Sequence, residues 1–321
     1  MVHSSCHTKP AVWRSSGRLL FLSLTVGIAL SGTAQTSNAA VIAHWSFDEI
    51  NASNQFEDDS GNAYHATIQA TGTEVGAATL TVDTSDKIFG AGAANFNRGS
   101  AHVTDQNNGD AEDGMPGSYA TVGGSVHGIY DDSHTVAAWV KVSQETSWSG
   151  LVGDWSNDSG SARAYLYGFT GDTAGDNAEK PMLTVQGENG GNGPINFSAT
   201  GTGPFTKDEW HHVAWVVHQV SETQSDLEIW VDGALYNSAT WDNASGTDIR
   251  ETTHPTWIGL KEDNGIDLHA KVDELWIFDT NLSPGSIRSL MNTNVIPEPA
   301  SVTLLGVGML LLGAPRRRSG N

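Results

Sequence analysis

Between residues 40 and 290, the apolar residues of the chain occur in short runs rich in β-branched and aromatic side chains. Stretches of Gly, Asn, Asp, Ser and Thr separate these runs. Runs of this length and composition indicate β-strands, because helices would repeat apolar residues at a spacing of three and four. The predicted strands are residues 41–47, 93–96, 134–142, 164–169, 182–185, 210–218, 226–231, 256–260 and 270–278.

Two of these runs, AWVKV within 134–142 and HVAWVVH within 210–218, have apolar side chains on both alternating faces. Strands of this kind lie at the centre of a sheet that is covered on both sides. Two packed antiparallel sheets explain the pattern better than one open sheet. The predicted fold is therefore an all-β, two-sheet sandwich.

The dipeptide Asp232-Gly233 separates the apolar runs LEIWV and ALYNSA. A two-residue connection between antiparallel strands needs positive φ angles, which Asp-Gly adopts readily. The sequence therefore predicts a β-hairpin over residues 227–239. The acidic, glycine-rich residues 105–124 are predicted to form a long loop.

A single short helix is predicted after the last strand. Ser283 suits its N-cap and Pro284 its first position, since proline lacks the N–H that a first turn leaves unused. Ile287, Leu290 and Met291 would share one face. We expect this helix to plug one end of the sandwich.

The first 39 residues have the organisation of a secretory signal peptide. A basic lead-in precedes the apolar residues 19–30, and Ser37-Asn38-Ala39 offers a small-residue cleavage site. The only cysteine, Cys6, lies in this leader. The roughly 250 residues that follow are enough for one large domain that folds on a hydrophobic core without disulfides.

The charge of the chain narrows the classes of partner. The sequence has 16 Lys and Arg against 37 Asp and Glu, a formal net charge of −21. Such an excess of acid argues against nucleic acid and anionic membrane surfaces as partners, and it favours cation binding.

Seven segments, taken in order, resemble the laminin G-like, concanavalin A-type jelly-roll domain. They are HWSFDE (44–49), DSGNAYHAT (59–67), FGAGAANFN (89–97), HTVAAWVKV (134–142), DEWHHVAWVV (208–217), IWVDGALYN (229–237) and KVDELWIFDTNLSPGSIRSLM (271–291). The resemblance implies a jelly-roll domain over residues 40–292. It also implies a binding role, because modules of this family often bind glycans.

Residues 293–321 resemble a PEP-CTERM sorting signal. The signature Pro297, Glu298 and Pro299 precedes 15 small and apolar residues, and the arginine cluster Arg316, Arg317 and Arg318 follows them. A helix of 15 residues is about 22 Å long, which is short for a hydrocarbon core of ~30 Å. The resemblance implies processing by an exosortase, membrane contact only before that step, and display at or release from a bacterial cell surface. The alternative is an ordinary C-terminal transmembrane helix.

A structural calcium ion (Ca2+) is implied by the same family resemblance. In that family a calcium often sits where the first strand, the Asp-x-x-Gly-Asn loop and the final strand converge. The matching residues are Asp48, Asp59, Asn62 and Asp273, and oxygen ligands of this kind suit calcium. In the alternative, Asp48 and Asp273 accept hydrogen bonds from loop amides, while Asp59 and Asn62 shape a turn.

Eleven tryptophans offer candidate sugar-binding surfaces. Trp148, Trp155 and Trp241 fall in predicted loops, where an indole face could stack on a sugar ring. Alternatively, these rings fold back onto the sandwich. Tryptophans within predicted strands (Trp45, Trp139, Trp215, Trp230, Trp276) are expected in the core or on a sheet face.

No catalytic signature is present in the sequence. Asp226, Glu228 and Asp232 share a strand face, but a solvated face explains them better than a pair of glycosidase acids. Asp273 and Glu274 are adjacent and would point to opposite faces of a regular strand. The function predicted from sequence is a secreted, surface-sorted, non-catalytic protein that binds extracellular polysaccharide or glycoprotein. A glycoside hydrolase or lyase on the same fold and a purely structural surface protein are the alternatives.

Overall fold

The computed structural model describes residues 39–69, 80–97, 118–123, 133–143, 149–155, 163–170, 180–187, 195–198, 206–249, 255–261 and 266–295. The chain divides into two compact units, Met1–Ser37 and Asn38–Asn321, and every described residue belongs to the second unit. The predicted signal peptide and the sorting signature with its arginine cluster lie outside the described residues.

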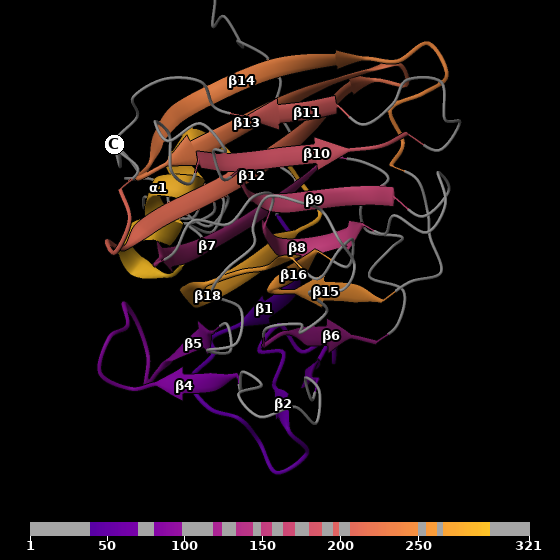
Figure 1. The fold of residues 1–321 in the computed structure, drawn as a ribbon. Coiled ribbons are helices and arrows are strands. Elements are labelled where there is room, and N and C mark those ends of the chain that lie inside the picture. The colour runs from indigo at the N-terminus through magenta and orange to yellow at the C-terminus, as the bar shows by residue number, and fades with distance from the viewer. Residues whose placement is uncertain are drawn as a thin grey trace, which may run out of the picture. The chain divides into compact units, whose positions relative to one another are not determined.

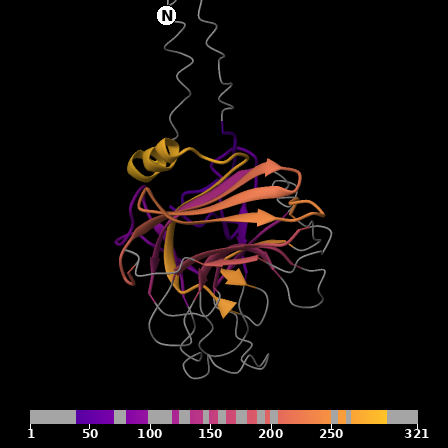
Figure 2. The same ribbon diagram turned by 90° about the horizontal axis from the view of Figure 1, so that it is seen from above.

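Two antiparallel sheets form the layers of a sandwich (Figures 1 and 2). Sheet A has eight strands in the order β14-β13-β12-β7-β18-β5-β4, and β1 pairs with β18 beside this path. These strands are β1 (Val41–Trp45), β4 (Thr81–Asp83), β5 (Ala93–Phe96), β7 (His134–Val142), β12 (His211–Ser221), β13 (Gln224–Val231), β14 (Ala234–Asp242) and β18 (Ala270–Phe278).

Sheet B also has eight strands, in the order β11-β10-β9-β8-β15-β6-β3-β2. These strands are β2 (Gln55–Phe56), β3 (Ala66–Ile68), β6 (Ala120–Val122), β8 (Ser149–Trp155), β9 (Arg163–Thr170), β10 (Lys180–Val185), β11 (Ile195–Ser198) and β15 (Thr256–Ile258). A separate two-stranded sheet consists of β16 (Leu260–Lys261) and β17 (Ile266–Asp267).

The hydrophobic core lies between the two sheets, because alternate side chains of each strand point to the facing sheet. The largest fully buried side chains in this core are Trp45, Phe47, Phe56, Phe96, Tyr165, Tyr167, Phe169, Trp215 and Trp241. Full burial of each such side chain stabilises the fold by about 1.5–3 kcal/mol. The core is therefore large enough to hold the domain together without a disulfide.

The predicted sandwich is confirmed, and β5, β7 and β18 begin and end at the predicted residues. The predicted hairpin is also confirmed: β13 and β14 are joined at Asp232 and Gly233, whose φ angles are 50° and 73°. The strand prediction was incomplete. Strands β2, β3, β4, β8, β11 and β17 were not predicted, and residues 120–122, assigned to the long loop, form β6.

Helix α1 (Pro284–Thr293) has the predicted N-cap, because the Ser283 hydroxyl accepts a hydrogen bond from Ser286 N at 3.1 Å. Its predicted position at the end of the sandwich was wrong. The helix packs against the outer face of sheet A (Figure 2), where one cluster contains Ile287, Leu290, Leu282, Ala137, Ala214, Val216, Trp230 and Phe278. This packing explains why β7 and β12 are apolar on both faces.

Both ends of the described domain are fastened to the sandwich. Ala40 N donates to Asp279 Oδ1 at 2.8 Å, and Asp279 N donates to Ala40 O at 3.1 Å. At the other end, Trp276 Nε1 donates to Asn294 Oδ1 at 3.0 Å. Residues 39–295 thus contain both sheets, α1 and the whole described core, and they form one folding unit.

Within the described ranges, no helix combines the length and the hydropathy that crossing a membrane requires. The apolar segment of the predicted sorting signal falls outside those ranges.

Candidate functional site

Sheet B has one face in the core and one face turned outward, and a row of side chains crosses the outward face. Each member lies directly opposite the next on the neighbouring strand, and such partners share a face. We call these residues the sheet B row: Thr184 (β10), Leu166 (β9), Gly153 (β8), Trp257 (β15), Thr121 (β6), Thr67 (β3) and Gln55 (β2).

Core residues flank almost every member of the row. Thr184 lies between Leu183 and Val185, and both of these belong to the main core cluster. The same alternation holds at Thr67 and Thr121, whose neighbours on each side are core residues. The row is therefore fixed on the outward face by the two-residue period of the strands.

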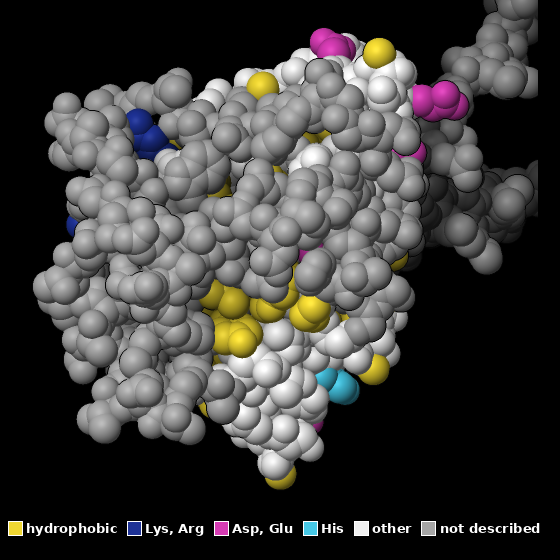
Figure 3. Space-filling view, turned by 45° about the vertical axis from the view of Figure 1, so that its right-hand side comes forward, with side chains coloured by type: hydrophobic (Ala, Val, Ile, Leu, Met, Phe, Trp, Pro, Cys, Tyr) yellow, Lys and Arg dark blue, Asp and Glu magenta, His cyan; other side chains and the backbone are white. Residues whose placement is uncertain are grey.

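Aromatic and apolar groups form the middle of this face. Trp155, Leu166 and Met182 make a hydrophobic cluster that is separate from the main core. Trp257, two strands away from Leu166, is 6% exposed, and Trp155 is 5% exposed. Figure 3 shows a patch of hydrophobic side chains in the middle of one side of the molecule, with others scattered singly around it.

Two polar atoms on this face have no hydrogen-bond partner in the part of the chain that the structure describes. One belongs to strand β10 and the other to the residue that follows it. They are Thr184 Oγ1 and Gln186 Oε1, and both residues are buried. A buried polar group without a partner costs about 1–3 kcal/mol. Because position 186 shares its strand face with Thr184 and Met182, these two atoms lie beside the apolar cluster. A ligand that carries hydroxyl groups could supply the missing hydrogen bonds.

The far end of the sheet B row is held by amide side chains. Gln55 Nε2 donates to Thr67 Oγ1 at 2.9 Å, and Gln69 Nε2 donates to Thr121 Oγ1 at 2.6 Å. These contacts orient the two hydroxyl groups, so this half of the face presents a fixed pattern of polar atoms.

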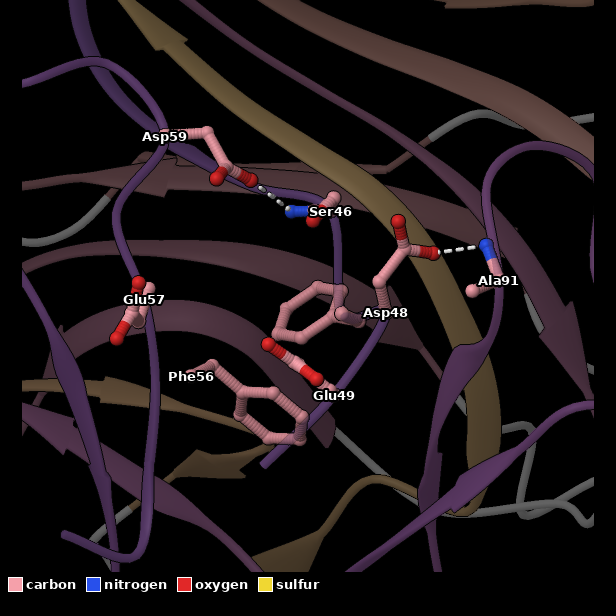
Figure 4. A pocket seen from close by; sticks show the side chains of 8 residues that line it. Ser46, Asp48, Glu49, Phe56, Glu57, Asp59 and Ala91 are labelled. Atoms are coloured by element: carbon pink, nitrogen blue, oxygen red, sulfur yellow. Dashed lines mark hydrogen bonds between the residues drawn. The ribbon is translucent and has the colours of Figure 1, made fainter. Parts of the chain in front are cut away.

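An acidic pocket lies beyond the Gln55 end of the row (Figure 4). It encloses about 330 Å³ and is lined by Ser46, Phe47, Asp48, Glu49, Phe56, Glu57, Asp59 and Ala91. Four of these eight residues carry carboxylates, and none carries a positive charge. The pocket gives this edge of the sandwich a negative field.

Two of the predicted calcium ligands, Asp48 and Asp273, bind the loop at residues 88–92. Asp48 Oδ1 accepts hydrogen bonds from Ala91 N and, at 2.9 Å, from Gly92 N. Gly90 has a φ of 56°, and a Cβ there would lie 2.2 Å from Asp48 Oδ1, so only glycine allows this close approach.

Asp273 fastens the start of the same loop. Its Oδ2 accepts from Ile88 N at 2.7 Å and from Phe89 N at 3.0 Å. Its Oδ1 is buried and has no partner among the described residues. Burial raises the pKa of Asp273 to about 6, against the two amide hydrogen bonds, and the nearby carboxylates of Glu274 and Asp48 add to the increase.

The other two predicted ligands have different neighbours. Asp59 lies across Ser46 from Asp48 in Figure 4, and its Oδ2 accepts from Ser46 N at 3.2 Å. Asn62 Nδ2 donates to Val41 O at 3.0 Å and to Ile42 O at 2.9 Å, at the opposite end of β1 from Asp48. Asn62 therefore does not share a shell with Asp48.

Within the described ranges, no group of three or more His, Cys, Asp or Glu side chains is arranged to hold a metal ion. The loop-amide contacts of Asp48 and Asp273 follow the alternative that the sequence left open. Calcium at this edge stays a prediction, and the free Asp273 Oδ1 is the feature that would suit a cation.

A bulge in β18 changes the expected direction of Glu274. Its φ is 54°, and the pairing of β18 with β7 shifts between Asp273 and Trp276. Val272 and Leu275 both belong to the core, so Asp273 and Glu274 both turn outward instead of pointing to opposite faces. Glu274 Oε2 lies 2.5 Å from His44 Nε2.

Two of the three tryptophans predicted to lie in loops belong to strands. Trp155 is the last residue of β8, on the outward face of sheet B. Trp241 is part of β14 and is only 1% exposed inside the core, so its ring faces are covered by protein. Trp148 lies outside the described residues. Trp257 was not predicted as a binding residue, although the pattern of its strand could have placed it on a sheet face.

The carboxylates considered for catalysis each accept a hydrogen bond from the protein. Asp226 Oδ1 accepts from Thr240 Oγ1 at 2.8 Å, and Glu228 Oε2 accepts from Trp230 Nε1 at 2.7 Å. Asp232 is 2.8 Å from His211 Nδ1.

Thr206, His211 and Asp232 are placed like the nucleophile, base and acid of a catalytic triad, but their hydrogen bonds serve another role. Thr206 N donates to His211 Nε2 at 3.1 Å, so this nitrogen is already an acceptor. The Thr206 hydroxyl donates to Glu209 Oε2 at 2.6 Å. Burial acts to raise the pKa of Asp232, but hydrogen bonds from His211 and from His212 N hold it below its usual value. The group fastens the β13–β14 turn.

A family model with the description "Concanavalin A-like lectin/glucanases superfamily" matches residues 113–288. One similar solved structure is domain 4 of AbnA, a GH43 extracellular arabinanase from Geobacillus stearothermophilus, in complex with arabinotriose. Its TM-score is 0.50 at 16% identity, and the match covers 79% of this chain and 99% of that chain. The binding domain of Paraclostridial Mosquitocidal Protein 1 has a TM-score of 0.50 and 13% identity, covering 80% of this chain and 52% of that chain. At these identities the likeness shows the fold alone. No protein with a curated description matches the sequence.

Proposed function

We propose that this chain, which belongs to the concanavalin A-like lectin/glucanases superfamily, is an exported, surface-sorted, non-catalytic protein that binds an extracellular polysaccharide on the outward face of sheet B. The observation that carries the proposal is the pairing of two kinds of group on this face. Trp155 and apolar side chains lie beside Thr184 Oγ1 and Gln186 Oε1, which lack protein partners among the described residues, and Trp257 lies three strands further along the row.

Sugar rings present both surfaces that such a site needs. Their C–H faces pack on aromatic and apolar side chains, and their hydroxyl groups donate and accept hydrogen bonds. The sheet B row runs across seven strands, which lie about 4.8 Å apart. Thr121, Thr67 and Gln55 are partly exposed, so a polysaccharide chain could follow this end of the row, beginning beside Trp257. The arabinotriose bound by the similar arabinanase domain is a ligand of this chemical class.

A non-catalytic role is supported by the state of the carboxylates. Asp226, Glu228 and Asp232 are engaged by protein donors, and the sheet B row itself contains no acid. Acid and base chemistry on a glycosidic bond needs two carboxyl groups beside the substrate.

The proposal is tested with residues 39–295 on a panel of immobilised polysaccharides, with binding and sugar release both measured. We expect retention without released product. Trp257→Ala should weaken the affinity by roughly 30-fold, since aromatic anchors of binding sites are worth about 2 kcal/mol or more. The matched control is Trp139→Ala on the outer face of sheet A, which should leave the affinity unchanged. Released sugar would favour the enzyme alternative, and no retention by any polysaccharide would overturn the proposal.

Calcium is a separate part of the proposal, and Asp48, Asp59 and Asp273 would hold it. Bound calcium would neutralise the buried Asp273 carboxylate and fasten the 88–92 loop. A ligand that binds only the folded state raises the Tm. We expect millimolar calcium to raise the Tm of the unmutated domain and to have no effect on Asp273→Asn. An equal Tm in calcium and in chelator would rule this ion out.

The export and sorting part is tested in the cell. An intact signature at Pro297-Glu298-Pro299 should yield a protein at the cell surface or in the medium that lacks the arginine cluster. Replacement of Pro297 and Pro299 by alanine should leave the full-length chain in the membrane fraction. Mass spectrometry of the C-terminus separates these results from the alternative of an ordinary transmembrane helix.

A further inference from the structure

Charge distinguishes the outward face of sheet B from the rest of the domain. The sheet B row has only uncharged side chains: Gln, Thr, Trp, Gly and Leu. The neighbouring positions on β10 and after it, Met182 and Gln186, are uncharged as well. By contrast, the whole chain has 37 acidic residues against 16 basic ones.

Little positive charge is available on this face. Among the basic residues whose side chains the structure describes, only Lys180, at the start of β10, shares the face of the row. Two others, Lys141 and Lys271, are bound to Asp83 and Asp86 on the opposite side of the domain. Arg288 donates to Gly233 O at 3.2 Å from helix α1.

Negative charge lies at the end of the row. Glu57 follows Gln55 by two residues and lines the acidic pocket together with Asp48, Glu49 and Asp59. A polysaccharide with carboxylate or sulfate groups that followed the row would approach these carboxylates. Repulsion between like charges would oppose its binding. Lys180 lies at the opposite end of the row, and Lys87, beside the pocket, donates to Gly90 O.

We infer that the ligand of the sheet B row is an uncharged polysaccharide, and that the acidic rim excludes uronate-bearing and sulfated chains. This inference rests on the proposed function and narrows its ligand class. Affinity for the uncharged ligand comes from packing on Trp257 and from hydrogen bonds, so it should not depend on salt. Repulsion of a charged chain is screened by salt, with a Debye length of about 10 Å at 0.1 M.

The test uses polymer pairs that share a backbone and differ in charge. These pairs are methyl-esterified and de-esterified homogalacturonan, hydroxyethyl cellulose and carboxymethyl cellulose, and dextran and dextran sulfate. Binding of residues 39–295 to each polymer is measured at 50 and 500 mM NaCl. Only binding that Trp257→Ala removes is counted, so that contacts elsewhere on the surface do not enter the comparison.

The expected result is binding to the uncharged member of at least one pair, with the same Kd at both salt concentrations. At 50 mM NaCl the charged partner should bind at least about tenfold more weakly, a difference of about 1.4 kcal/mol. The difference should shrink at 500 mM NaCl.

Removing a charge from the acidic rim sharpens the test. Glu57 is exposed and lines the acidic pocket but does not belong to the row, so Glu57→Gln should fold, and it should strengthen binding of the charged polymer at 50 mM NaCl severalfold. It should leave binding of the uncharged polymer within about twofold. Glu57→Asp, which keeps the charge, is the matched control and should leave binding of both polymers unchanged.

Two outcomes would contradict the inference, and they are distinguishable. Equal or tighter Trp257-dependent binding of the charged polymers at 50 mM NaCl would overturn the ligand class and leave the proposed function in place. No Trp257-dependent binding of any polymer would overturn the proposed function and this inference together.

Discussion

The outer faces of the two sheets differ in the groups that their side chains contact. On sheet A, helix α1 covers one half, and the other half carries charges that pair within the protein. Asp86 accepts from Lys141 at 3.0 Å, from Lys271 at 2.6 Å and from Trp210 Nε1 at 2.8 Å. On sheet B, tryptophans and uncharged polar groups share the face, and two polar atoms lack partners among the described residues.

This difference indicates which face is available for a ligand. The charges of Asp86, Lys141 and Lys271 on sheet A pair with one another, so a ligand at that part would have to displace ion pairs, which is unfavourable. Three other buried atoms on this sheet, Trp139 Nε1, His212 Nδ1 and Asp273 Oδ1, have no partner among the described residues. On sheet B, a hydroxyl-bearing ligand would supply bonds that the protein lacks. The two outer faces therefore differ in charge: ion pairs cover part of sheet A, whereas the sheet B row is uncharged.

The largest effect should come from the helix that covers sheet A. Leu290→Ala removes a buried side chain from the contact between α1 and the sheet, which should lower the free energy of unfolding by about 3 kcal/mol. Polysaccharide affinity of the folded variant should not change. Urea denaturation and a binding titration measure the two quantities. A loss of affinity in the fully folded variant would mean that the packing of α1 on sheet A affects ligand binding on sheet B.

The buried carboxylate of Asp273, one of the proposed calcium ligands, should make the domain less stable as pH rises. Its folded pKa of about 6 exceeds the usual value of about 3.9, so the folded state binds the proton more tightly. Its contribution is present below pH ~4 and is lost as pH rises through about 6.

In calcium-free buffer, Asp273→Asn should therefore be more stable than the unmutated domain at pH 7.5, by about 2 kcal/mol, and equal to it at pH 4. Denaturation at both pH values measures the difference. A variant that is less stable at pH 7.5 would contradict the raised pKa. Calcium that abolished the advantage of the variant would support the proposed ion.

The charge network of sheet A should respond to pH in the opposite direction. The hydrogen bond from Lys271 lowers the pKa of Asp86 to about 2, against its burial, and it also lowers the pKa of Asp83. Depressed pKa values contribute stability above pH ~4 that is lost as pH falls towards 2.

Lys271→Met should therefore cost about 1–2 kcal/mol at pH 7 and almost nothing at pH 2. Lys180→Met, on β10 of sheet B and outside this network, serves as the control and should have no effect at either pH. An equal loss at pH 7 and pH 2 would show that Lys271 acts through packing instead of charge.

The smallest effect should come from the sheet B row, where stability and polysaccharide affinity should change in opposite directions. Thr184→Val replaces a buried hydroxyl that has no described partner by a methyl group of the same shape. The free energy of unfolding should rise by about 1 kcal/mol, whereas polysaccharide affinity should fall about threefold to tenfold. A variant that is both less stable and unchanged in affinity would indicate that the Thr184 hydroxyl serves the fold and not a ligand.

The sequence predicted those parts of the fold whose cause is local. Strands β7 and β18 have long apolar runs, Asp232-Gly233 has the backbone freedom that the hairpin needs, and Ser283 caps α1. Strand β8 was missed because Gly150 and Gly153 interrupt its apolar pattern, and glycine usually marks a turn.

The candidate site was harder to predict, because it depends on contacts between distant segments. The positive φ of Glu274 is rare for such a residue, and the strand pairing sets the bulge that turns it outward. Likewise, the outward face of Trp257 depends on its register with Gly153 and Thr121. Loop tryptophans were a reasonable expectation, but Trp241 packs in the core because β14 extends further than its pattern indicated.

The most direct test of the central claim follows the tryptophan indole N–H signals by NMR during titration with an oligosaccharide of the bound polysaccharide. Binding on sheet B predicts shifts at Trp155 and Trp257 and none at Trp139 or Trp210, which belong to the side of sheet A. Shifts confined to Trp139 and Trp210 would contradict the account, because they would place the ligand on the face whose charges are already paired.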